Sequence, residues 1–313
     1  MPNLRVAFCG LELQNPIITA SGTFSAKGSG DFYDFSKLGA VTAKGVAIEP
    51  WSGNPTPRIA EVSSGMLNAI GLENPGASRF IAEEIPLMRK GIGSSDTKII
   101  VNLAGRSEND YVRVAELLNA ADVDMLELNI SCPNIKEGGI LFGVSPTMAE
   151  KVTRSVRSVV TKPLIVKLTP NVTNICEIAQ AVESDGADAL SLINTLAGMR
   201  IDVKKRCHVL GNKIGGLSGP AVLPVAIRMV YQVAAAVKIP IIGMGGIMTG
   251  EDAAEFLMAG ASAVAVGTAA LVDPIAPLRI LDELKEFMVE NDFVDIEAIK
   301  NALQLTSLGR STI

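Results

Sequence analysis

Five polar side chains stand at the ends of five apolar runs in this chain, and their types and positions suggest that they act together. They are Lys44, Asn102, Asn129, Lys167 and Asn194. Lysine and asparagine are uncommon in strands, and burying either one costs free energy unless its polar group finds a partner. A single such residue is usually a satisfied structural side chain. Five at equivalent positions predict a ligand-binding site where the ends of the runs meet.

A cysteine follows one of these runs. Residues 126–139 lead from an apolar strand through Cys132 and Pro133 to Gly138 and Gly139. Proline cannot extend the ladder of strand hydrogen bonds, and the glycine pair gives the backbone freedom. We therefore expect Cys132 to lie where a strand passes into a flexible loop. The alternative is an inert, buried thiol, because free cysteines are most often buried.

Eight short apolar runs alternate with helical patterns along the chain, as in proteins built on a parallel sheet. The runs are residues 16–20, 40–44, 98–103, 125–129, 164–168, 189–194, 240–244 and 263–267. Helical patterns with one apolar face occupy residues 110–121, 147–160, 174–185, 221–237 and 250–259. This alternation predicts an α/β fold, a (β/α)8 TIM barrel formed by residues 1–313 as a single domain.

Further segments flank or interrupt this repeat. Residues 4–13 alternate around Cys9 and Gly10, which predicts an N-terminal β-hairpin closing one end of the barrel. Residues 49–74 and 197–218 are too long for ordinary loops, and both follow strands. We expect these insertions on the C-terminal face, where such barrels keep their active sites. Residues 296–313 are expected to add a helix and a polar tail outside.

Composition limits the function classes. The chain has 313 residues and a formal net charge of -5, which does not favour nucleic acid or an anionic membrane as a partner. No apolar run approaches the roughly 18 residues that span a bilayer, and we find no signal-sequence pattern, so we expect a cytoplasmic protein. Cys9, Cys132, Cys176 and Cys207 form no C-x-x-C pair, and the one histidine, His208, is expected in a solvated loop. No metal site is predicted.

Glycines follow the last two strand runs. Gly245–Gly246 and Gly267–Thr268 stand where barrels bind phosphate, because glycine lets backbone N–H groups approach an anion closely. Residues 215–220 add another Gly-rich element at the same corner. The pattern predicts a phosphate site, which could serve a phosphorylated substrate or a cofactor.

Together these motifs resemble the catalytic subunits of class 1B dihydroorotate dehydrogenases. The matching stretches span nearly all of the barrel: residues 20–22, 68–76, 129–139, 166–168, 193–195, 215–220, 243–246 and 266–268. The run from Cys132 to Gly139 is similar to class 1B in particular. The resemblance implies oxidation of (S)-dihydroorotate to orotate in de novo pyrimidine biosynthesis, with hydride passing to N5 of FMN.

The resemblance also implies the roles of individual residues. Cys132 would be the catalytic general base that takes a proton from the substrate. The implied substrate-binding residues are Lys44, Asn68, Ala69, Ile70, Gly71, Leu72, Asn129, Asn194 and Thr195. The implied cofactor-binding residues are Ser21, Lys44, Gly45, Asn102, Asn129, Lys167, Ile193, Gly219, Gly245, Gly246, Gly267 and Thr268.

The resemblance implies one FMN per chain, with FAD and a [2Fe–2S] cluster only on an electron-transfer partner subunit that reduces NAD⁺. Two chains of each kind would form a heterotetramer. The sequence agrees with a separate partner, because it has neither a G-x-G-x-x-G unit nor cysteine spacing for a cluster. Three alternatives remain open: a fumarate-linked dihydroorotate dehydrogenase, a dihydropyrimidine dehydrogenase, and a flavin-free, phosphate-binding lyase barrel with Lys44 or Lys167 as a Schiff-base lysine.

Overall fold

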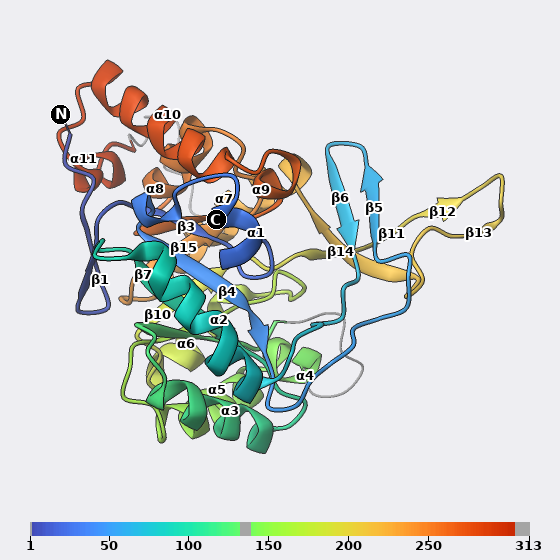
Figure 1. Ribbon diagram of the computed structural model, residues 1–313. Coiled ribbons are helices and arrows are strands. Elements are labelled where there is room, and N and C mark those ends of the chain that lie inside the picture. Colours follow the sequence, from blue (N-terminus) through green and yellow to red (C-terminus); the bar gives the residue numbers. More distant parts are fainter. Residues whose placement is uncertain (1, 132–138, 304–313) are drawn as a thin grey trace.

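The computed structural model describes residues 2–131 and 139–303, and at its centre is a closed barrel of eight parallel strands (Figure 1). In their order around the barrel, the strands are β10 (Ala189–Leu192), β15 (Ile241–Met244), β16 (Ala263–Val266), β3 (Ile17–Thr19), β4 (Ala40–Val46), β7 (Lys98–Leu103), β8 (Met125–Asn129) and β9 (Leu164–Lys167). Each strand matches one of the eight predicted runs to within two residues. The (β/α)8 prediction is therefore confirmed.

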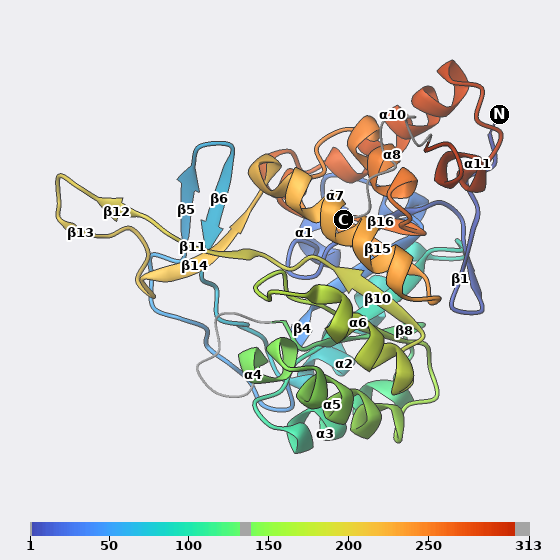
Figure 2. The same cartoon turned by 180° about the vertical axis from the view of Figure 1, so that it is seen from behind.

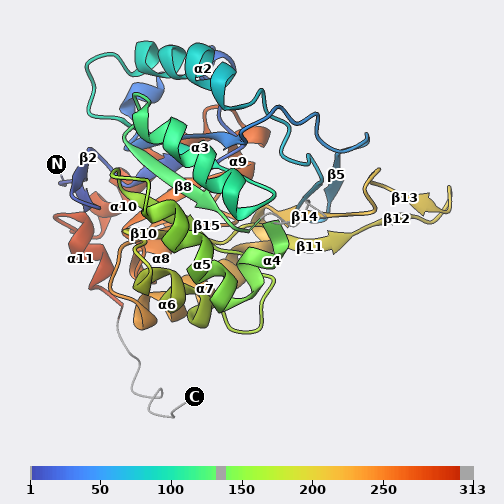
Figure 3. The same ribbon diagram turned by 90° about the horizontal axis from the view of Figure 1, so that it is seen from below.

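Helices pack around the outside of the barrel, as the views in Figure 2 and Figure 3 show. The longer ones are α2 (Ala77–Ile92), α3 (Glu108–Ala120), α5 (Pro146–Arg157), α6 (Ile175–Ser184), α7 (Leu223–Ala236), α8 (Gly250–Met258) and α10 (Ala276–Glu290). Ser107 and Thr249 begin α3 and α8 with capping boxes, in which side chains satisfy the first free backbone N–H groups. Short helical segments are α1 (Ala26–Gly30), η1 (Phe35–Lys37), α4 (Gly139–Val144), η2 (Pro220–Val222), α9 (Thr268–Val272) and α11 (Ile296–Lys300).

The predicted N-terminal hairpin is formed by β1 (Val6–Phe8) and β2 (Leu11–Leu13). Cys9 and Gly10 both have positive φ angles, of 50° and 77°, and make the tight turn between the strands. The Cys9 thiol donates a hydrogen bond to the carbonyl oxygen of Asp188 at 3.3 Å, just before β10 begins. The hairpin therefore packs at the amino-terminal end of the barrel, opposite the end where the polar strand-end residues lie.

The two insertions join into one antiparallel sheet, which we call the accessory sheet. Its strands, in order, are β11 (Leu196–Met199), β14 (Ile214–Ser218), β6 (Gly65–Asn68) and β5 (Ile59–Val62). It has a small core of its own, made of Leu67, Ala69 and Leu210. Figure 1 and Figure 2 both show this sheet to one side of the barrel. The sequence predicted two long insertions but not their pairing.

Beyond the accessory sheet, a smaller hairpin of β12 (Ile201–Asp202) and β13 (Cys207–His208) projects furthest from the barrel (Figure 1). His208 is exposed, as predicted, but it lies in β13 rather than in a loop. At the other end of the chain, α11 buries Ile296 and Ile299 against the core, and residues 304–313 lie outside the described part. Among residues 2–131 and 139–303, no helix combines the length and the apolar character needed to cross a bilayer.

Candidate active site

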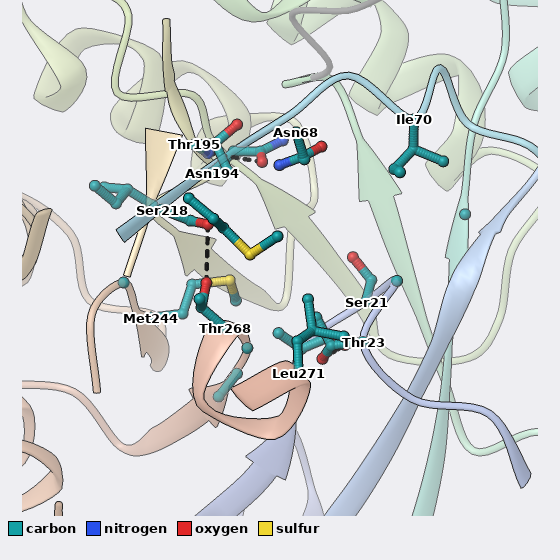
Figure 4. Close-up of a pocket in the computed structure, with 18 of the residues that line it drawn as sticks. Ser21, Thr23, Asn68, Ile70, Asn194, Thr195, Ser218, Met244, Thr268 and Leu271 are labelled. Carbon is teal, nitrogen blue, oxygen red and sulfur yellow. Dashed lines mark hydrogen bonds between the residues drawn. The ribbon is translucent and has the colours of Figure 1, made fainter. Parts of the chain in front are cut away.

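A cavity of about 390 Å³ lies at the carboxyl ends of the barrel strands, beside the accessory sheet. This volume lies within the range of small-molecule sites. All five polar residues singled out at strand ends line it: Lys44, Asn102, Asn129, Lys167 and Asn194. In Figure 4, Asn68, Asn194 and Thr195 gather on one side of the cavity, and Thr268 and Leu271 lie on the opposite side. The prediction that the strand-end residues converge is confirmed.

Most of the other residues assigned by resemblance also line the cavity. They are Ser21, Gly45, Asn68, Ile70, Gly71, Leu72, Ile193, Thr195, Gly245, Gly246, Gly267 and Thr268. Ala69 and Gly219 are not part of the cavity wall. Ala69 packs in the core of the accessory sheet, and Gly219 forms a turn with φ of 97° directly after Ser218, which does line the cavity. Cys132 lies outside the described residues.

Lys167 is buried, with 4% of its surface exposed, which excludes an ordinary surface lysine. Its ammonium donates a hydrogen bond to Ser21 Oγ at 3.1 Å and lies 3.9 Å from Oε2 of Glu127. Glu127 in turn accepts hydrogen bonds from Asn102 Nδ2 at 2.5 Å and from Ser191 Oγ at 2.7 Å. The positive charge at the cavity wall is therefore held between a hydroxyl and a buried carboxylate.

The barrel register explains why these side chains meet. Asn102 pairs with Glu127, Asn129 pairs with Lys167, and Lys167 pairs with Ser191 on the next strand. Partners in register project to the same side of a sheet, and residues two apart on one strand do the same. One side of β7, β8, β9 and β10 thus presents a set of polar groups to the barrel interior: Asn102, Glu127, Asn129, Lys167 and Ser191.

A chain of side-chain hydrogen bonds continues along the cavity wall. Asn129 Nδ2 donates to Asn102 Oδ1 at 3.1 Å, and Asn129 Oδ1 accepts from the backbone N–H and the hydroxyl of Ser131. Asn194 Nδ2 donates to Ser131 Oγ at 2.7 Å, while Asn194 Oδ1 accepts from the backbone N–H of Thr195 at 2.8 Å. These bonds fix the amide orientations before any ligand binds, which lowers the entropy cost of recognition.

Lys44 differs from Lys167 because it has no hydrogen bond or ion pair with any residue in the described ranges. Burial lowers the pKa of Lys44, the positive charge of Arg58 lowers it further, and the carboxylate of Glu73 acts in the opposite direction. A partly buried cation without a partner is costly, and an anion entering the cavity would relieve that cost. Lys44 is therefore suited to hold an anionic ligand.

The glycine pair after β15 has the geometry expected of an anion cradle. Gly245 and Gly246 have φ angles of 129° and 86°, which L-residues with side chains rarely adopt. A Cβ atom on Gly246 would lie 2.8 Å from the backbone nitrogen of Leu223, at the first residue of α7. Across the cavity corner, Thr268 Oγ1 donates to Ser218 Oγ at 2.8 Å (Figure 4). The missing side chain at Gly246 therefore lets the backbone pack directly against the start of α7, and both glycines line the cavity at this corner.

Two other glycines contribute differently. A Cβ atom on Gly45 would lie 2.8 Å from Asn102 Oδ1, so the absence of a side chain there makes room for the buried amide. Gly267 has a negative φ angle, and a Cβ atom there would only touch Ala20 at 3.4 Å. A Cβ atom at Gly267 would therefore be less crowded than one at Gly45 or Gly246.

The family model described as "Dihydroorotate dehydrogenase" matches residues 3–288 of this chain. The chain belongs to the dihydroorotate dehydrogenase family. A similar protein from Alkaliphilus metalliredigens is 56% identical over 302 residues, which are 96% of this chain and 99% of the relative. Another from Alkaliphilus oremlandii is 57% identical over 298 residues, which are 95% of this chain and 97% of the relative. Both are named "Dihydroorotate dehydrogenase B (NAD(+)), catalytic subunit". A protein of that name from Halalkalibacterium halodurans is 54% identical over 292 residues, 93% of this chain and 94% of its own length. The family resemblance drawn from the motifs is confirmed.

Sequence reasoning missed some residues in and behind the cavity wall. One of them is Glu127. Its signal in the sequence was a charged residue inside an otherwise apolar strand, because a charged residue is rarely buried without a partner. Ile59, Met66 and Leu217 line the cavity from the accessory sheet, and Leu271 lines it from α9. No local pattern marked these four, because the sheet that places three of them depends on the pairing of two distant insertions.

Proposed function

We propose that this chain is the catalytic subunit of an NAD⁺-linked dihydroorotate dehydrogenase, which oxidises (S)-dihydroorotate to orotate in de novo pyrimidine biosynthesis. The observation that carries the proposal is the pairing of two unlike lysines at one cavity. Lys167 is buried and has the carboxylate of Glu127 3.9 Å from its ammonium, whereas Lys44 is partly buried and unpaired among the described residues. The first suits a cofactor that gains negative charge, and the second suits an anionic substrate.

The residues of the cavity fit FMN. The backbone at Gly245–Gly246 and at Gly267–Thr268, which lines the cavity, would hold its phosphate through N–H groups. Lys167 would lie against the flavin ring, with Asn102 and Asn129 beside it. When bound, the flavin supplies a hydride acceptor at N5. The Lys167 ammonium would stabilise the negative charge that the reduced ring carries.

The same cavity would orient dihydroorotate. Lys44 would pair with the substrate carboxylate. Asn68, Asn129 and Asn194 would read the ring's N–H and C=O groups, because each amide offers both a donor and an acceptor. The Asn68 amide already donates to the carbonyl oxygen of Gly216 at 3.3 Å, which ties it to the accessory sheet. Neighbouring residues that would close around the ring are Ile70, Gly71, Leu72 and Thr195.

Cys132 is proposed as the base that removes the proton from C5 of the substrate while hydride leaves C6. It comes directly after Ser131, whose backbone and hydroxyl bind Asn129 and Asn194. Those bonds anchor the chain at the cavity up to the residue before Cys132. Support for the role of Cys132 itself comes from the sequence motif.

Electrons are proposed to leave through a separate subunit that carries FAD and a [2Fe–2S] cluster and reduces NAD⁺, in a heterotetramer of two catalytic and two electron-transfer chains. The names of the relatives support this, because they combine NAD(+) with the words "catalytic subunit". The sequence supports it as well, since it lacks a dinucleotide-binding glycine motif and cluster-type cysteine spacing.

The test is to assay the purified full chain with dihydroorotate against a dye, NAD⁺ and fumarate, with and without the co-expressed partner. We expect a yellow protein that reduces the dye alone and reduces NAD⁺ only with the partner. Rapid reduction of NAD⁺ or fumarate by the chain alone would contradict the proposal. Thermal protection by uracil rather than orotate would indicate a dihydropyrimidine dehydrogenase, and a colourless protein trapped on substrate by borohydride would indicate a lyase.

A further inference from the structure

A buried carboxylate lies directly behind the cavity wall. Glu127 has 2% of its surface exposed and is not among the residues that line the cavity. Its side chain points into the barrel from the middle of β8, and its two oxygens are bound by Asn102 and Ser191. A carboxylate buried this deeply is costly unless hydrogen bonds and an opposite charge compensate it.

The hydrogen bonds alone do not require a charge at this position. A glutamine of the same length could accept from Asn102 Nδ2 through its carbonyl oxygen and meet the Ser191 hydroxyl through its amide nitrogen. What a glutamine could not supply is a negative charge 3.9 Å from the Lys167 ammonium. The distinctive contribution of Glu127 is therefore its charge, acting on Lys167.

We propose that Glu127 is a positioning residue that acts through Lys167 and lowers the reduction potential of the flavin bound beside that lysine. This inference rests on the proposed function, which places FMN in the cavity. Ser21 binds the Lys167 ammonium from one side and Glu127 attracts it from the other, so the carboxylate keeps the ammonium at the cavity wall. The same carboxylate offsets part of the positive field that favours the reduced, anionic flavin.

Removing the negative charge of Glu127 would have two consequences, one for the flavin potential and one for the position of Lys167. Without Glu127 the field at the ring becomes more positive, so the reduced flavin is stabilised and its potential rises. Lys167 also loses its restraint on one side. A carboxylate with a purely structural role would affect folding but would leave the potential of the correctly folded, flavin-loaded chain unchanged.

The experiment compares Glu127→Gln with wild type and with the control Ser191→Ala, which removes one hydrogen bond to Glu127 but keeps its charge. Each full chain is loaded with FMN and titrated with dihydroorotate and orotate, and the equilibrium constant for flavin reduction is read from the flavin absorbance. The midpoint potential is measured independently against a reference dye. Both readouts are equilibrium properties and do not depend on turnover.

We expect Glu127→Gln to shift the equilibrium at least tenfold toward reduced flavin and Ser191→Ala to stay within twofold of wild type. An equilibrium constant for Glu127→Gln within twofold of wild type would overturn the inference. If that variant does not fold, Glu127→Ala, which also removes the charge, decides by the same thresholds: a shift of at least tenfold toward reduced flavin supports the role of the charge, and a constant within twofold of wild type overturns it. A wild-type chain that takes up no FMN would refute the proposed function instead.

Discussion

Replacing Lys167 by methionine should destabilise the flavin-free chain strongly, because it leaves Glu127 as a buried, uncompensated charge. Lys167 and Glu127 have 4% and 2% of their surfaces exposed, and their charged atoms are 3.9 Å apart. Methionine fills most of the volume of the lysine stem, so the substitution removes mainly the charge. Flavin-free protein is used so that ligand binding does not contribute to the measured stability.

The magnitude follows from this geometry. At 3.9 Å and an effective dielectric constant of about 20, the attraction between two unit charges is about 4 kcal/mol. Removing one partner of a buried ion pair typically costs about 3–5 kcal/mol. We take about 3 kcal/mol, because Asn102 and Ser191 still donate hydrogen bonds to Glu127. For 313 residues the unfolding entropy is about 0.66 kcal/mol/K, so Tm should fall by about 5 °C.

Differential scanning calorimetry measures this shift, and Lys285→Met is the matched control. The Lys285 ammonium lies closer to its partner, 2.9 Å from Asp282 Oδ1, but the two side chains are 43% and 69% exposed. Solvent screens such a pair, so the control should lose less than about 1 °C. The double variant Lys167→Met/Glu127→Gln should recover most of the loss. Equal losses in Lys167→Met and Lys285→Met would refute the reasoning.

Four further outcomes are expected. Cys132→Ser should slow flavin reduction by dihydroorotate at least tenfold in rapid-mixing absorbance while orotate binding stays within about threefold, because a hydroxyl is a far weaker base than a thiolate. Orotate affinity should fall as pH rises through the pKa of Lys44, which burial places below its usual 10.5, and Lys44→Met should abolish this pH dependence in titration calorimetry. Gly246→Ala should weaken FMN retention at least tenfold in a fluorescence titration, because its Cβ would press on the start of α7. Iodoacetamide at pH 8 should label exposed Cys207 but not Cys9, whose pKa burial and then Asp188 raise to about 12, as peptide mass spectrometry would show.

The sequence by itself determined the barrel and most of the cavity wall. A parallel strand is covered on both faces, so it must be an apolar run, and each of the eight runs was recognisable without reference to the others. Lys44, Asn102, Asn129, Lys167 and Asn194 stood out because polar residues in such runs need partners. Since all strands of the barrel point the same way, the ends of separate runs had to meet at one face.

The glycines were predictable only in part. The positive φ angles and close backbone contacts at Gly245 and Gly246 agree with the motif that singled them out. Gly267 was singled out by the same logic, but its φ angle is negative and a Cβ atom there would meet only Ala20, at 3.4 Å. A glycine in a sequence permits a special conformation or a close approach, and only the surrounding atoms decide whether either one occurs.

Only the tertiary structure decided which charges meet. Glu127 and Lys167 are forty residues apart and become an ion pair because the register of β8 and β9 puts both on the inner side of the barrel. The accessory sheet joins Asn68 to Gly216 across 148 positions of the chain and so brings apolar side chains over the cavity. Local patterns encode which face of an element is apolar. The partner of a buried charge is set by the closure of the whole barrel, and that information is not local.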